Sequence, residues 1–263
     1  MTVDFPYLQR LVLEMSGNLL EADKAYLAEA RLAGLATRQG HRDVGGLLQS
    51  LRNSPPDARH VEVVEAMTTK ETMFFRDPQL FDALREHVLP GCRGLVRMWC
   101  MGCATGQEPY SVAMLAAEQF PAMTLHLLAS DISRAALATA EAGAYTEFEM
   151  GRGLAAERRE RWFTGSDGGW LLDAALRRRV TWARVNLVDP LPDVGTFDVV
   201  FLRNVLIYLD PVVKRRVLEG VRDRLGAHGL LFLGAPENLM DYPDLFQSVP
   251  VGRALGYRPS STA

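Results

Sequence analysis

The hydrophobic pattern of this sequence changes in kind near residue 94. Before that point, apolar residues recur at helical spacing in short stretches, and no strand pattern is found. After it, short apolar runs alternate with amphipathic stretches. Strands that alternate with helices build a parallel sheet with helices on both faces. We therefore predict an α/β protein with a doubly wound sheet in residues 89–263 and an all-helical N-terminal domain in residues 1–88.

Short helices are expected throughout the first part. Asp4 and Pro6 are typical of a helix start, and Gly17 of a helix end. Further helices are expected at 25–35, around 44–51 and at 61–67.

The second part carries the alternation of strands and helices. One segment, 148–183, interrupts it with a helical piece, a glycine-rich turn and two short strand patterns at 170–172 and 180–182, so we predict an inserted small β-subdomain there. Elsewhere the pattern predicts strands at 95–100, 125–129, 197–201 and 230–233, and helices at 108–120, 133–143 and 211–225.

Composition excludes several classes of protein. The net charge is -3, whereas a nucleic-acid-binding protein usually carries a basic excess. There are three cysteines, Cys92, Cys100 and Cys103, and a small, odd number argues against a disulfide framework. Cys100 and Cys103 have no second ligand pair, so we predict no metal site. No signal peptide and no apolar run of about 20 residues are found, so we expect a cytoplasmic chain that does not insert into a membrane.

A turn between a predicted strand and helix, Trp99–Gly106, indicates a ligand site. Gly102 and Gly106 let the backbone approach a ligand closely. Asp131 ends the next apolar run, where a carboxylate accepts hydrogen bonds from ribose hydroxyls; the alternative is that it caps the helix starting near Ser133. The turn matches neither G-x-G-x-x-G nor G-x-x-x-x-G-K-[ST], so it favours a nucleoside-type methyltransferase over a dinucleotide or triphosphate enzyme.

Three longer motifs identify a family. Thr68–Asp77 resembles T-x-N-E-T-x-F-F-R-D, Gly102–Ser111 resembles G-C-S-T-G-x-E-P-Y-S, and Arg203–Leu209 resembles R-N-V-L-I-Y-F. Together they resemble the chemoreceptor glutamate methyltransferases, the CheR family. Shorter matches are Asn186-Leu187 and Gly234–Glu237. The sequence departs from the family pattern at Lys70, where Asn is usual, and at Ala104, where Ser is usual.

The resemblance implies a fold and an activity. The fold would be a Rossmann-like methyltransferase sheet with a helical N-terminal domain and an inserted β-subdomain. The activity would be that of a protein-glutamate O-methyltransferase, which uses S-adenosylmethionine, releases S-adenosylhomocysteine and forms glutamate γ-methyl esters in bacterial chemosensory adaptation. The implied partner is the cytoplasmic helical domain of methyl-accepting chemoreceptors, with no nucleic acid. We expect a monomer.

Residue roles follow from the motif positions. Arg76 is expected to pair with a carboxylate of cofactor or substrate, or else to form a surface salt bridge. Tyr208 is expected beside the transferred methyl group, or else in the core. Glu108 is expected to accept from the cofactor ammonium, or else to serve as a first-turn charge. The other expected cofactor-binding residues are Thr72, Gly102, Asp131, Asn186, Leu187, Arg203 and Asn204. No role is assigned to Lys70.

Other functions would share this cofactor fold. A DNA amino-methyltransferase commonly carries N-P-P-Y after the strand where this chain has Arg203-Asn204-Val205-Leu206. A small-molecule methyltransferase would leave the helical domain and the insertion unexplained. A catalytically silent adapter remains the alternative from another class. Residues 151–184 carry eight arginines and four acidic residues, which gives a local net charge of +4. This charge would either steer an acidic receptor segment or be only an ordinary solvated surface.

Overall fold

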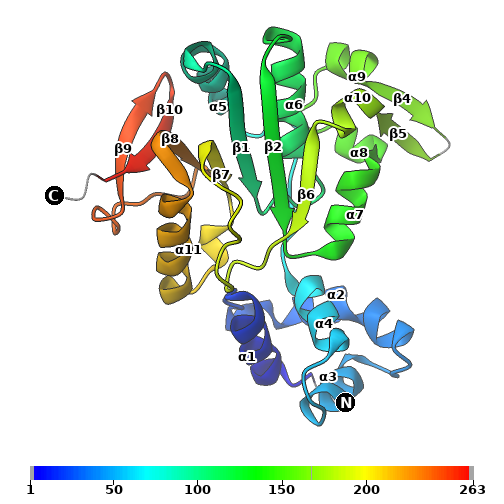
Figure 1. Cartoon of the computed structure of the whole chain (residues 1–263). Coiled ribbons are helices and arrows are strands. Elements are labelled where there is room, and N and C mark those ends of the chain that lie inside the picture. Colours follow the sequence, from blue (N-terminus) through cyan, green and yellow to red (C-terminus); the bar gives the residue numbers. More distant parts are fainter. Residues whose placement is uncertain (1–2, 167, 261–263) are drawn as a thin grey trace.

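A computed structural model describes residues 3–166 and 168–260. Its centre is a seven-stranded sheet in the order β6-β2-β1-β7-β8-β10-β9 (Figure 1). The strands are β1 (Leu95–Met101), β2 (Thr124–Asp131), β6 (Val180–Arg184), β7 (Phe197–Leu202), β8 (Leu225–Leu233), β9 (Phe246–Val251) and β10 (Ala254–Pro259).

Five neighbouring strands of this sheet, from β6 to β8, run parallel. Side chains of β1 alternate between the two faces: Met98 and Cys100 belong to one hydrophobic core, and Trp99 and Met101 to another. Helices cover both faces, since α6 (Gln107–Gln119) contributes to the first core and α11 (Pro211–Asp223) to the second. The doubly wound α/β fold is therefore confirmed.

The sheet ends on one side in an antiparallel hairpin that the sequence pattern did not predict. β10 pairs with β8 and β9, and β9 is the edge strand, with Pro250 opposite Leu255. Strand β8 also begins earlier than expected, at Leu225 instead of residue 230, because α11 already ends at Asp223.

The N-terminal part is helical as predicted and has its own core. Its helices are α1 (Phe5–Ser16), α2 (Ala25–Arg38), α3 (Val44–Arg52) and α4 (Ala58–Met67). Asp4 caps α1 by accepting from Tyr7 N, and Gly17 ends it in the left-handed region at φ 71°. Helix α4 begins three residues before the expected Val61, because Asp57 and His60 form a capping box there.

This helical unit lies at the end of the sheet where β1, β2 and β6 finish (Figure 1). Backbone hydrogen bonds attach it: Leu19 N donates to Tyr208 O at 2.8 Å, and Asp210 N donates to Gly17 O at 2.9 Å. Glu65 of α4 accepts from Arg134 N at 2.9 Å, at the start of α7 (Arg134–Ala142). In open α/β sheets, ligands bind at this carboxyl end of the strands.

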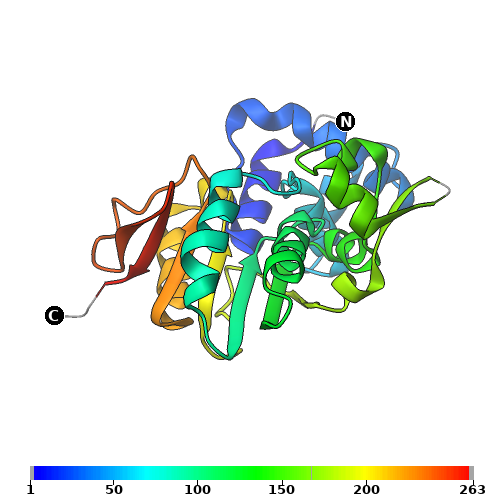
Figure 2. The same cartoon turned by 90° about the horizontal axis from the view of Figure 1, so that it is seen from above.

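A second, three-stranded sheet in the order β3-β5-β4 lies between α7 and β6 in the sequence. Figure 2 shows it at the opposite end of the molecule from the β9–β10 hairpin. Its strands are β3 (Ala144–Tyr145), β4 (Phe163–Ser166) and β5 (Gly169–Leu172), and its helices are α8 (Glu147–Met150), α9 (Ala156–Trp162) and α10 (Ala174–Arg177).

The predicted bounds of the inserted β-subdomain, 148 and 183, were both wrong. The strand pattern at 180–182 belongs to β6 of the main sheet, where Val180 lies opposite Leu127 of β2. It fits there because Val180 is buried. The small sheet also begins before residue 148, since Ala144 pairs with Leu171. No helix in residues 3–166 or 168–260 is long and apolar enough to cross a membrane.

Candidate active site

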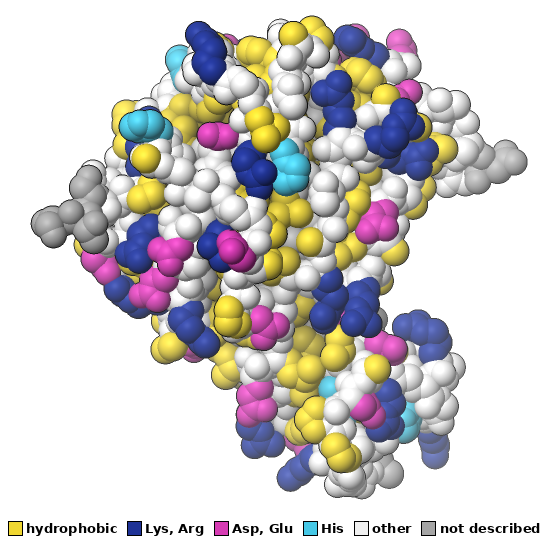
Figure 3. Space-filling view, in the orientation of Figure 1, with side chains coloured by type: hydrophobic (Ala, Val, Ile, Leu, Met, Phe, Trp, Pro, Cys, Tyr) yellow, Lys and Arg dark blue, Asp and Glu magenta, His cyan; other side chains and the backbone are white. Residues whose placement is uncertain are grey.

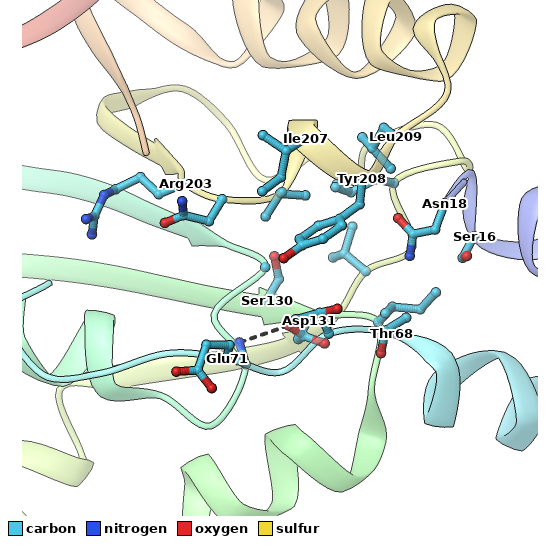
Figure 4. Close-up of a pocket in the computed structure, with 18 of the residues that line it drawn as sticks. Ser16, Asn18, Thr68, Glu71, Ser130, Asp131, Arg203, Ile207, Tyr208 and Leu209 are labelled. Atoms are coloured by element: carbon cyan, nitrogen blue, oxygen red, sulfur yellow. Dashed lines mark hydrogen bonds between the residues drawn. The ribbon is translucent and has the colours of Figure 1, made fainter. Parts of the chain in front are cut away.

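A cavity opens at the carboxyl ends of β1, β2, β6 and β7, the place where open α/β sheets bind their ligands (Figure 4). A smaller recess adjoins it and shares Arg76, Gly102, Arg203 and Asn204 with it. Of the predicted site residues, Asp131, Asn186, Leu187 and Tyr208 also line the cavity, while Thr72 and Glu108 line the recess.

The turn between β1 and α6 brings backbone to the cavity wall. Gly102 and Ala104 both have left-handed φ values, 71° and 47°. Gly102 N and Cys103 N donate to Ser130 O at 2.7 and 3.0 Å, which fixes the turn against β2. A Cβ atom on Gly102 would lie 2.5 Å from Val205 Cγ2, so only glycine fits.

Asp131 joins this turn to the end of β2. One carboxylate oxygen accepts from Ala104 N at 2.9 Å and the other from Ser133 N at 2.8 Å. Burial raises the pKa of Asp131, against the lowering effect of these two donors and of the Lys70 ammonium. The capping of α7 is done by Ser133, which accepts from Ala136 N. Asp131 therefore lines the cavity without being the helix cap, and its role toward a ribose stays a prediction.

Arg203 forms a buried charge cluster behind the cavity. Its Nη1 donates to Glu108 at 2.5 Å, and its Nη2 donates to Asp77 at 2.5 Å and to the carbonyl of Arg76 at 2.8 Å. Burial opposes the charge, yet Glu108 and Asp77 raise the pKa of the guanidinium. Figure 4 shows this side chain directed away from Tyr208 and Asp131. The recess itself is lined by two carboxylates, Glu71 and Glu108, and by two guanidinium groups, Arg76 and Arg203, so its formal charges balance.

Strained backbone is confined to the three motifs. Within residues 3–166 and 168–260, the non-glycine residues with positive φ are Phe75, Asp77, Ala104 and Asn204, at 49°, 59°, 47° and 57°. Such residues cluster at functional sites, where the surrounding structure enforces the conformation. The motifs therefore specify backbone shape as well as side chains.

Arg76 and Tyr208 meet the same cavity from different segments. The side chain of Arg76 makes no ion pair with any residue that the structure describes, in contrast to Arg203. Tyr208 ends a short 3-10 helix (Leu206–Tyr208), and its ring reaches across the cavity toward Asp131 (Figure 4). Both are placed to contact a ligand, and their catalytic roles stay predictions.

Asn186 follows β6 and lines the cavity, but its carboxamide is already engaged. Asn186 Nδ2 donates to Met15 O, in the last turn of α1, at 2.7 Å. It therefore holds the N-terminal unit against the cavity. Lys70 lies outside the cavity, in a groove beside Glu65 and Ala135.

Glu237 holds a loop of the candidate site, and we predicted no role for it, although its motif Gly234–Glu237 was noted. Its Oε2 accepts from Asn204 N at 2.7 Å and Gly234 N at 2.8 Å, and its Oε1 accepts from Val205 N at 3.0 Å and Ile207 N at 3.2 Å. One carboxylate thus shapes the loop that carries Asn204 and Tyr208. The sequence does not show this role, because the partners of Glu237 are backbone N–H groups and not side chains.

Cys100 and Cys103 are both buried, and burial raises the pKa of both thiols. They are thiols packed under the turn, which matches their interpretation as small residues at a strand end. Within the described part of the chain, no three His, Cys, Asp or Glu side chains lie together as metal ligands would.

The basic segment 151–184 is largely neutralised by carboxylates from outside it. Lys and Arg side chains gather over the small sheet in Figure 3. However, four of the eight arginines form ion pairs. Of the four acidic residues counted in this segment, Asp167 lies outside the described residues. The pairs are Arg152–Glu71, Arg158–Glu118, Arg159–Glu147 and Arg184–Glu65.

The sequence was compared with known families. Residues 70–255 match the family described as "CheR methyltransferase, SAM binding domain". The chain belongs to the CheR methyltransferase family. It is 38% identical to chemotaxis protein methyltransferase 1 of Pseudomonas aeruginosa, over 97% of each chain. It is 36% identical to chemotaxis protein methyltransferase Cher2 of Pseudomonas putida, over 97% of this chain and 98% of the relative.

Among solved structures, the N-methyltransferase NodS of Bradyrhizobium japonicum in complex with S-adenosylhomocysteine is 16% identical, with a TM-score of 0.43 over 73% of this chain and 90% of that one. As a CheR family member, the chain is a methyltransferase whose cofactor is S-adenosylmethionine. The lining fits this cofactor, which carries a sulfonium, an ammonium and a carboxylate, because it offers groups of both charge signs. The cavity is lined by the carboxylates of Glu71 and Asp131 and by the guanidinium groups of Arg76 and Arg203.

Proposed function

We propose that this chain is a protein-glutamate O-methyltransferase. It would transfer a methyl group to glutamate side chains in the cytoplasmic helical domain of methyl-accepting chemoreceptors, in bacterial chemosensory adaptation. The names of its relatives, chemotaxis protein methyltransferases, support this assignment. The protein would then work in the cytoplasm, with residues 1–88 as its helical domain and residues 89–263 as its methyltransferase domain.

The observation that carries the proposal is the charge of Arg76, which no described carboxylate pairs. Its guanidinium borders the cavity without an ion-pair partner in residues 3–166 or 168–260, and none of the residues lining the cavity or the recess is a histidine. A glutamate acceptor is already ionised near neutral pH and needs no general base. An unpaired cation at the cavity suits an acceptor that is itself a carboxylate.

S-adenosylmethionine supplies a methyl group on a sulfonium, and its transfer to a carboxylate oxygen leaves a thioether and a neutral ester, with no proton released. The protein contributes alignment and the exclusion of water. Arg76 orients the acceptor carboxylate by charge-assisted hydrogen bonds. Tyr208 lines the same cavity and would cover the reacting atoms.

The remaining residues hold the cofactor. Asp131 would accept from the ribose, and Glu108, at the recess, would accept from the ammonium. Thr72 lies at the same recess and donates its hydroxyl to the methionine part. The cavity wall around the adenosine and the methionine part would be completed by Gly102, Asn186, Leu187, Arg203 and Asn204.

The test uses cofactor with a labelled methyl group and purified receptor cytoplasmic domains. The proposal predicts label on the receptor that is released as methanol by mild base, because carboxyl methyl esters are base-labile. A receptor domain with its acceptor glutamates changed to alanine is the control and should stay unlabelled. Base-stable label, or labelling that is the same in the control, would reject the proposed acceptor.

A further inference from the structure

The N-terminal segment 16–19 is part of the cavity wall. Ser16 and Asn18 line the cavity together with residues from the sheet. Asn18 forms a bridge with Leu209, flanked by the hydrogen bonds of Leu19 N to Tyr208 O and of Asp210 N to Gly17 O. The backbone at Asn18 is therefore fixed on both sides before any ligand binds.

The side chain of Asn18 is half-buried and points into the cavity (Figure 4). Its polar neighbours are already engaged: Ser16 Oγ donates to Val12 O, and Asn186 Nδ2 donates to Met15 O, both at 2.7 Å. The carboxamide of Asn18 makes no hydrogen bond to any described residue. The backbone of Asn18 is fixed, and its carboxamide offers the cavity a donor and an acceptor that no described residue uses.

The position of Asn18 along the cavity indicates the part of the ligand that it meets. Figure 4 shows Arg203 at one end, Asn18 and Ser16 at the other, and Asp131 between them. The charged recess at the Arg203 end suits the amino-acid part of S-adenosylmethionine, and Asp131 suits its ribose. The adenine is the remaining part, and the Asn18 end is the remaining space.

We propose that Asn18 binds the adenine base. A carboxamide accepts from the exocyclic 6-amino group with its oxygen while it donates to a neighbouring ring nitrogen, as asparagine does when it reads adenine in DNA. The N-terminal helical unit would then take part directly in cofactor recognition. This inference rests on the cofactor alone and does not depend on the acceptor proposed above.

The experiment is a double-mutant cycle by calorimetry, without any methyl acceptor. Wild type and Asn18→Ala are each titrated with S-adenosylhomocysteine and with its analogue lacking the 6-amino group. The substitution removes no backbone contact, so the fold should persist. Asn53→Ala, an exposed asparagine at the end of α3, is the matched control.

Wild type should prefer S-adenosylhomocysteine over the analogue by roughly 3- to 10-fold, the effect of one neutral hydrogen bond. Asn18→Ala should lower affinity for S-adenosylhomocysteine and lose most of that preference, and Asn53→Ala should keep it. Unchanged affinity in Asn18→Ala would overturn the proposal. A loss of affinity that is equal for the two ligands would also overturn it, because Asn18 would then contact another part of the cofactor.

Discussion

Arg203, at the end of β7, and Glu108, in the first turn of α6, form a buried ion pair with 2.5 Å between Nη1 and Oε2. The same guanidinium also binds Asp77 and the carbonyl of Arg76. One side chain therefore connects all three sequence motifs. The three motifs therefore depend on one another physically. Arg203 supplies a buried positive charge, and the other two motifs supply the carboxylates that compensate it.

Replacing Glu108 with alanine should destabilise the fold by about 3 kcal/mol, because the buried guanidinium of Arg203 loses one of its two carboxylates. Urea unfolding measures this change. Glu157→Ala, at an exposed position, is the control and should change stability little. If Glu108→Ala unfolds like the control, the ion pair does not support the fold.

Glu237→Gln should distort the loop after β7, because an amide nitrogen would face backbone N–H groups that now donate to a carboxylate oxygen. We expect a loss of roughly 1–3 kcal/mol in stability and weaker S-adenosylhomocysteine binding. The matched control is Glu160→Gln on the exposed side of α9. A normal cofactor affinity in Glu237→Gln would separate this carboxylate from the site.

Asp131→Ala should weaken S-adenosylhomocysteine binding by roughly 1–3 kcal/mol if a buried ribose hydrogen bond is lost. Calorimetry on the folded variant measures this. An affinity equal to that of wild type would remove Asp131 from the cofactor site.

The raised pKa of Asp131 also predicts opposite effects of pH on stability and on binding. A raised carboxyl pKa means that the folded chain binds the proton more tightly than the unfolded chain, so wild type should gain stability relative to Asp131→Asn as pH falls through that pKa. Cofactor affinity of wild type should fall over the same range, since a protonated carboxyl offers fewer acceptor sites. Parallel pH profiles of wild type and Asp131→Asn would contradict both expectations.

Arg76→Ala should lose at least about 100-fold in methyl transfer while its unfolding midpoint stays close to that of wild type, because positioning a reactant contributes strongly to rate. Initial rates and thermal unfolding are measured on the same preparation. Losses of activity and of folded fraction in equal proportion would make Arg76 a structural residue.

Receptor methylation should fall as salt rises at low receptor concentration if the arginines without ion pairs steer the acceptor. Reversing the charges of Arg177, Arg178 and Arg179 should flatten this salt profile while cofactor affinity is unchanged. Reversing Lys214 and Arg216 on α11, which form no ion pair with a described residue, provides a control for charge reversal elsewhere on the surface. Identical profiles for wild type and the first variant would assign these arginines to solubility or folding.

Much of the fold was predictable because local signals and burial agree. Asp4, Gly17 and Ser133 act as the caps that their residue types suggest. The short strand at Val180–Arg184 was placed in the wrong sheet, since periodicity identifies a strand but not its partner. The β9–β10 hairpin was missed for a related reason, because Pro250 and the glycine at Gly256 weaken its strand pattern.

The candidate site was predictable where motifs carry side-chain chemistry and less so where contacts join distant segments. The sequence placed Asp131 and Arg203 near the cofactor, but it could not show that Arg203 faces Glu108 and Asp77. Asn18 carries no motif, and it reaches the cavity only because segment 16–19 lies against Tyr208 and Leu209.

The proline in the outermost strand has a consequence for how copies of this protein meet at high concentration. A sheet edge with free amide groups is a template on which a second chain can add its own strand. Pro250 has no amide hydrogen to offer, so a ladder of hydrogen bonds with a second chain along β9 would be interrupted one residue before the strand ends. The last strand of the sheet therefore carries a residue that disfavours the addition of a further strand.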